Sequence, residues 1–73
     1  MKLPILKPKE VIKILQRAGF YVDHQSGGHI ALLNDNTKKR VTLPAHPKDI
    51  KKGTLHNIIK QSGLSLEEFV RLR

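Results

Sequence analysis

One stretch of the chain decides the predicted fold: FYVDHQSGGHIALLNDNTKKRVTL, residues 20–43. Three segments in it, residues 20–24, 29–33 and 39–43, are rich in β-forming residues and largely alternate between apolar and polar side chains. The two segments between them, QSGG and NDNT, carry the glycine, asparagine and aspartate that favour tight turns. The stretch therefore predicts a three-stranded antiparallel meander.

Helical periodicity is found on both sides of this meander. Before it, apolar residues recur three and four positions apart over residues 8–18, which predicts an amphipathic helix with a proline at its first position. After it, the same spacing predicts a second helix with Thr54 as its N-cap and Gly63 as its end, although a start one turn earlier also fits. Both long helices have an apolar side to bury, and we expect both to cover one face of the sheet.

A short third helix is predicted at the end of the chain. Ser65 is followed three residues later by Glu68, the spacing of a capping box, and the helix is expected to end near Leu72. The predicted fold class is therefore α+β, with the order α-β-β-β-α plus a short C-terminal helix. This order resembles the double-stranded RNA-binding domain. No linker or repeat divides the chain, so residues 1–73 are expected to form a single domain.

Charge and composition narrow the class of partner. The chain has 14 Lys and Arg against 6 Asp and Glu, a formal charge of +8, which favours a polyanion: nucleic acid first and an acidic protein second. The absence of cysteine excludes disulfides and thiolate sites. We find neither a signal peptide nor a stretch apolar enough to cross a membrane, so a cytoplasmic location without membrane contact is expected.

Four separated motifs stand in an order that resembles one protein family. A glycine turn before a histidine is followed by LPAH, by KGTL and by IIKQSGL with EEF beyond it. Together they resemble the HicA toxins, over about residues 8–72. The resemblance implies an endoribonuclease that cleaves mRNA, an mRNA interferase of a type II toxin–antitoxin module. It also implies a fold like that of the double-stranded RNA-binding domain and a HicB-like antitoxin as the protein partner.

The same resemblance places the active histidine at His29, directly after the glycine turn. Many members carry a serine where this chain has Gly28, so a hydroxyl beside the imidazole is missing here. Chemistry supports His29 independently, because metal-free RNA cleavage needs a base for the ribose 2′-OH, and histidine titrates near neutral pH. Gly27 and Gly28 would let a phosphate approach the backbone closely. From the residues alone, an exposed histidine beside a tight turn is the simpler interpretation, and the resemblance favours the catalytic one.

His46 is a second candidate, held between Pro44 and Pro47 in an extended loop. Two interpretations stay open for it: an acid, base or phosphate ligand, or a packing role in the loop before the second helix. His24 and His56 are expected to be bystanders. The histidine spacings match no metal-ligand pattern, so we predict no metal and no small-molecule cofactor.

RNA contacts are predicted at basic residues on the first helix and around the third strand. The aromatic content of 4% limits stacking on bases, so sequence-specific reading is expected to be weak. The predicted RNA-binding residues are Lys9, Lys13, Lys38, Lys39, Arg40, Lys48, Lys51 and Lys52.

Two alternatives to an enzyme remain on the sequence evidence. The first is a non-catalytic RNA-binding module that uses the same lysines only to hold phosphates. The second, weaker alternative is a DNA-binding module, which the lack of an evident helix-turn-helix disfavours. Loss of toxicity on replacing His29, with folding retained, would decide for the enzyme.

Overall fold

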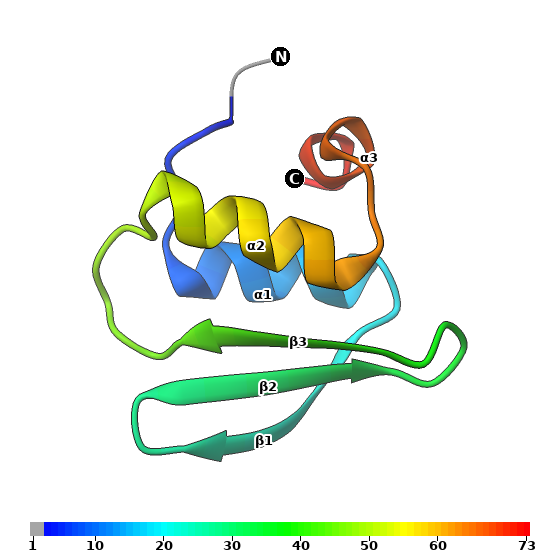
Figure 1. Ribbon diagram of the computed structural model, residues 1–73, viewed down its shortest axis with the longest axis horizontal. Coiled ribbons are helices and arrows are strands. Elements are labelled where there is room, and N and C mark those ends of the chain that lie inside the picture. The colour runs from blue at the N-terminus through cyan, green and yellow to red at the C-terminus, as the bar shows by residue number, and fades with distance from the viewer. Residues whose placement is uncertain (1–2) are drawn as a thin grey trace.

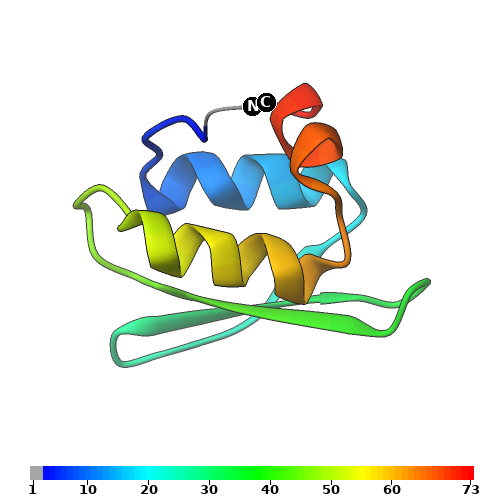
Figure 2. The same cartoon turned by 45° about the horizontal axis from the view of Figure 1, so that its top comes forward.

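The computed structural model describes residues 3–73, in which three helices and three strands follow the predicted order (Figure 1). Figure 2 shows α1 and α2 on the same side of the sheet, so the α+β architecture predicted from the sequence is confirmed. The elements are α1 (Pro8–Arg17), β1 (Tyr21–Ser26), β2 (His29–Asn34), β3 (Lys39–Pro44), α2 (Lys52–Ser62) and α3 (Leu66–Arg71).

The sheet is an antiparallel meander with β2 in the centre. In its register, His29 pairs with Ser26 on β1 and with Pro44 on β3. Side chains alternate along β2, so Ile30 and Leu32 face the helices and are buried. A bulge in β1 shifts the register between Val22 and His24.

The helices cover β2 and β3 but leave β1 open. Every residue of β1 is exposed, including Tyr21 and Val22, whereas β2 and β3 supply the buried inner face. In Figure 1, β1 is the strand farthest from α2. Residues outside the sheet and the two long helices also contribute to the core. Among them are Leu6, which precedes α1, and Phe69 of α3, both fully buried.

Local signals set most of the element ends. Gly63 caps α2 in the left-handed conformation (φ 77°), as predicted. The capping box of α3 is confirmed: the Glu68 N–H donates to Ser65 Oγ and the Ser65 N–H donates to Glu68 Oε1, each at 3.0 Å. The prediction of Thr54 as the N-cap of α2 is wrong. The Leu55 N–H already donates to the Lys51 carbonyl (2.9 Å), so the first turn closes with Lys51 as N-cap, one turn earlier.

The turn between β2 and β3 is tied to the rest of the fold through the buried side chain of Asn34. Asn34 Oδ1 accepts from the backbone N–H groups of Asn36 (2.9 Å) and Thr37 (3.2 Å), while its Nδ2 donates to the Ala18 carbonyl (3.2 Å). The turn therefore satisfies its own backbone and is held against the end of α1.

Candidate functional site

The glycine turn presents His29 at one end of the sheet. Ser26 and His29 pair across the two-residue turn, and Gly27 has a φ of +56°, which a residue with a Cβ rarely adopts. Gly28 is not in the left-handed region, so only Gly27 is required by conformation. Beyond the adjacent residues, no atom lies within 4 Å of where a Cβ would stand on either glycine, and His29 is exposed. The turn thus offers bare backbone beside an accessible imidazole.

The loop after β3 is fastened to this turn. The Ala45 N–H donates to the Gly28 carbonyl at 2.7 Å, which continues the β2–β3 pairing one step beyond His29 and Pro44. His46 follows directly and is exposed. The backbone therefore brings together two histidines that lie far apart in the sequence.

Both histidines line one open cavity of about 560 Å³ between the end of β3 and the start of α2. Asp49 is the only acidic residue among the described residues that line it, against two lysines. The first turn of α2 has no side-chain cap and no acidic residue, so the positive end of its dipole adds to the local potential. The polar side chains that line the cavity are His29, Thr42, His46, Lys48, Asp49, Lys51, Thr54 and Gln61.

Gln61 fixes the far wall of this cavity. Its Oε1 accepts a hydrogen bond from the Thr42 N–H (3.1 Å), which joins α2 to the edge strand β3. Neither Gln61 nor Thr42 is among the site residues predicted from the sequence. The only signal for Gln61 was its place in the IIKQSGL motif, and nothing in the sequence predicted its contact with β3.

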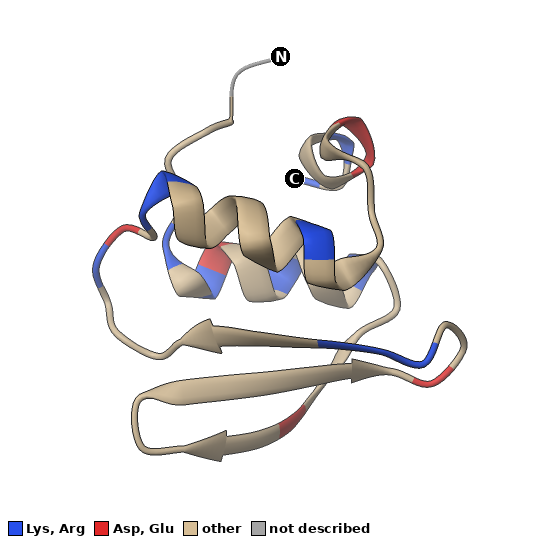
Figure 3. Cartoon of the chain, viewed as in Figure 1, with Lys and Arg blue, Asp and Glu red and all other residues tan. Residues whose placement is uncertain are grey.

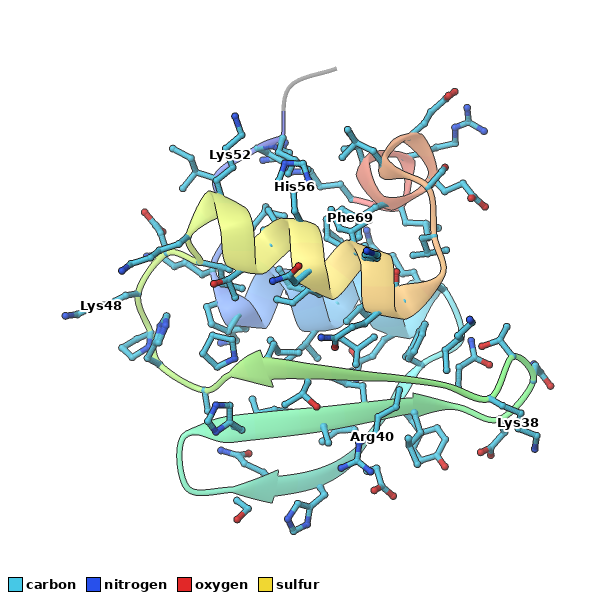
Figure 4. All side chains as sticks on the ribbon, viewed as in Figure 1. Lys38, Arg40, Lys48, Lys52, His56 and Phe69 are labelled. Carbon is cyan, nitrogen blue, oxygen red and sulfur yellow. The ribbon has the colours of Figure 1, made fainter. Side chains whose placement is uncertain are left out.

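The basic residues of β3 lie at the other end of the sheet. Lys39 pairs with Asn34, five residues along the strand from Pro44, so about 17 Å separates the two ends at ~3.4 Å per residue. Figure 3 shows basic segments both at the start of β3 and in the loop before α2. In Figure 4, Lys38 and Lys48 lie on opposite sides of the molecule. The six cations that lie within fifteen residues of sequence, from Lys38 to Lys52, are therefore divided between separate surfaces.

The remaining predicted cations also lie outside the cavity. Lys52 and His56 project from α2 away from the sheet (Figure 4). Lys13 is exposed on α1 beside Glu10 and Arg17, and the Arg17 Nη1 donates to the Leu72 carbonyl at 2.9 Å. Lys9 borders a separate groove near the start of α1. The structure thus brings Lys48 and Lys51, of the predicted RNA contacts, to the same cavity as His29.

No metal centre is evident in the described part of the chain. Within residues 3–73, no group of three or more His, Asp or Glu side chains is placed to hold an ion. His24 lies on β1 and pairs with Ala31, which is two residues from His29 on β2. It does not line the cavity.

These features define a class: a small, strongly basic α+β protein whose open cavity is lined by histidines and lysines. Comparison with protein families makes the assignment specific, because the model described as HicA toxin of bacterial toxin–antitoxin systems matches residues 8–64. The chain belongs to the HicA toxin family, a family of mRNA-cleaving toxins. A search of curated proteins gave no match. None of the helices within residues 3–73 is long and apolar enough to span a membrane.

Proposed function

We propose that this chain is a metal-independent endoribonuclease that cleaves mRNA in the bacterial cytoplasm until a HicB-like antitoxin neutralises it. Family membership supports the role as a toxin. One observation of the structure supports the proposed cleavage mechanism. His29 and His46 line the same open cavity as Lys48 and Lys51, beside a turn of bare glycine backbone. This is the set of groups that RNA cleavage without a metal needs.

The proposed reaction is transfer of the phosphate to the neighbouring ribose oxygen. His29 takes the proton from the 2′-OH, the 2′-oxygen attacks phosphorus, and the bond to the 5′-oxygen of the next nucleotide breaks. The leaving oxygen takes a proton from an acid, for which His46 is the candidate because it shares the cavity. The products are a 2′,3′-cyclic phosphate and a free 5′-hydroxyl. Lys48 and Lys51 offset the charge that develops on the phosphate oxygens.

Removing His29 is the direct test. His29→Ala should lower the cleavage rate by ~10²-fold or more and leave RNA affinity within a few-fold, because a base is lost but only one weak phosphate contact. His56→Ala is the matched control, since His56 lies on the far side of α2. Cleavage should persist in EDTA. A His29→Ala chain that cleaves at the parental rate, or activity that EDTA abolishes and magnesium restores, would contradict this mechanism.

The two separated groups of cations allow a test of where RNA binds. If about four cations contact a single strand, log K should fall with log salt at a slope of roughly −3. Lys48→Gln combined with Lys51→Gln should flatten that slope by more than the matched pair Lys38→Gln and Arg40→Gln, because only the first pair borders the His29 cavity. Equal effects of the two pairs would mean that RNA contacts the whole basic surface.

A non-catalytic RNA-binding module is the second candidate function, and one observation favours it. No side-chain hydrogen bond within residues 3–73 involves the His29 ring, whereas a general base is usually held by a partner. One measurement distinguishes the ribonuclease from the non-catalytic module. A module without catalysis would bind RNA with the same salt dependence and release no cyclic phosphate, with or without His29.

The antitoxin is expected to be acidic and to cover the glycine turn together with the exposed sheet face. Such a placement would block the base and the cavity lysines at once, and unlike charges would make association fast and salt-dependent. His29→Ala should keep the partner bound while toxicity is lost, whereas charge reversal at Lys39 and Arg40 should weaken the complex. Hydrogen exchange that protects only the helical side, with the His29 turn still open, would contradict this placement.

A further inference from the structure

A second groove lies beside the cavity described above and shares His46 with it. It is formed by the start of α1, the start of β2 and the loop after β3, and has a volume of about 480 Å³. Its lining is mostly apolar, whereas the first cavity is lined largely by polar side chains. Lys7 and Lys9 stand at the α1 side of the groove. Its apolar lining comes mainly from Ile12, Ile30, Ala45 and Pro47.

The walls of this groove are fixed by the fold. Ile30 follows His29 on β2 and faces the core, and Ala45 is held by its hydrogen bond to the Gly28 carbonyl. Ile12 is the partly exposed member of the apolar side of α1. Two walls of the groove therefore belong to regular elements, and the loop that forms the third wall is tied to the sheet through Ala45. The volume of the groove lies within the roughly 300–1,000 Å³ of small-molecule sites, which are usually preformed.

We propose that this groove binds a nucleobase of the RNA, next to the phosphate held in the His29 cavity. The inference rests on the proposed ribonuclease function and assigns it a base subsite. His46 is the common wall, so a strand with one phosphate in the first cavity continues directly to the groove. Lys7 and Lys9 are then placed to contact the backbone phosphate that follows.

Charge and shape favour a base over an apolar side chain of a protein partner. A base is flat and apolar on both faces and is carried on an anionic backbone, which suits an apolar groove with lysines at one side and a histidine at the other. The imidazole of His46 and the ring of Pro47 offer flat surfaces for packing. Because the lining carries few hydrogen-bonding side chains, the groove should select a base by size more than by its polar edge.

The test compares RNA oligonucleotides that lack one base at a time. The protein carries His29→Ala so that the RNA stays intact, and the affinity of a short single strand is compared with that of the same strand made abasic at each position in turn. One position should account for most of the loss, roughly 10-fold. Ile12→Trp, which fills the groove, should lower the affinity for the intact strand about as much. In that variant, removing the same base should change the affinity little, and only direct contact explains such coupling.

Controls separate the groove from folding and from the proposed chemistry. Ile5→Trp is the matched control, because Ile5 is exposed and lies outside the groove, and Ala45→Phe fills the groove from the loop side if Ile12→Trp does not fold. If the coupling between Ile12→Trp and base removal is found but the parental chain cleaves no RNA, the base subsite is supported and the ribonuclease proposal is wrong. Cleavage that depends on His29, with equal abasic losses at every position, rejects the subsite alone. If Ile12→Trp leaves RNA binding unchanged but weakens the antitoxin complex, the groove binds protein and the proposal is wrong.

Discussion

Replacing Gly27 and Gly28 separately by alanine distinguishes what the turn needs for folding from what it needs for function. Gly27 has a φ of +56°, in the left-handed region, and Gly28 does not. In both cases the added methyl group would meet no atom within 4 Å beyond the adjacent residues. The two substitutions therefore differ in backbone strain and are alike in the new surface that they create.

The expected magnitudes follow from these two facts. A left-handed conformation costs an alanine about 1–2 kcal/mol, and alanine restricts the unfolded chain enough to stabilise the fold by about 0.4–1 kcal/mol. Gly27→Ala should thus lower the free energy of unfolding by roughly 1 kcal/mol. Gly28→Ala has only the favourable contribution and should be neutral or slightly stabilising. In a chain of 73 residues, 1 kcal/mol corresponds to a shift in Tm of roughly 4–8 °C, so the two variants should melt at clearly different temperatures.

RNA cleavage is then measured well below both melting temperatures, beside thermal unfolding of each variant. If a phosphate approaches the bare backbone of the turn, both alanines should slow cleavage, although only Gly27→Ala destabilises the fold. Gly28→Ser introduces the side chain found in many HicA toxins. It should fold as well as the parent, because the position has an ordinary φ and open space.

Two results would refute this reasoning in different ways. If Gly28→Ala destabilises the protein as much as Gly27→Ala, backbone strain at the turn has been placed at the wrong residue. If both variants cleave RNA at the parental rate, the phosphate does not contact the turn, and the glycines serve only to close the β1–β2 hairpin.

Three further predictions concern α3 and are tested by thermal unfolding. Ser65→Ala should cost about 1 kcal/mol, because it removes the side-chain acceptor for the Glu68 N–H; an unchanged Tm would mean that the capping box contributes nothing. The Ser65 N–H holds the pKa of Glu68 below its usual value, so this stabilisation is complete above the unfolded pKa and is lost as pH falls through the folded one. Glu68→Gln should make the Tm less dependent on pH in that acidic range, and an identical pH profile would contradict it. Phe69→Ala should cost about 3–5 kcal/mol, a large part of the roughly 4–11 kcal/mol expected for a domain this small, and a Tm within a few degrees of the parent would show that α3 is not part of the core.

The sequence predicted those features that depend on a few neighbouring residues. The glycine turn before His29, the left-handed Gly63 and the capping box at Ser65 each arise from local backbone chemistry, and each is present in the structure. The start of α2 was placed at Thr54 because threonine is a good N-cap by type, and the start that forms is the alternative one turn earlier. The first turn closes at Lys51, where no side chain caps the helix, so side-chain capping does not set this start.

The division of the cations between two surfaces was missed because they were grouped by nearness in sequence, although the strand predicted over residues 39–43 already separates Lys39 from Lys48. Lys39 and Lys48 are close in sequence, yet β3 carries the chain across the length of the sheet between them. The wall made by Gln61 depends on how α2 packs against the edge of β3, and neither periodicity nor motif spacing encodes that contact. Cations that are close in sequence are therefore far apart in the fold. His29 and His46, in contrast, are far apart in sequence and line one cavity.

The register of the β2–β3 hairpin is the physical basis of the candidate site. A slip of one residue would turn His29 toward the helices and Ile30 toward solvent, because side chains alternate between faces. Two features oppose that slip: the glycine turn fixes one end of β2, and the side-chain hydrogen bonds of Asn34 fix the other. The bond from the Ala45 N–H to the Gly28 carbonyl then transmits the same register to the loop that carries His46. A protein with so small a core can in this way hold two histidines in a defined relation without a hydrogen bond between them, because the backbone ladder positions both.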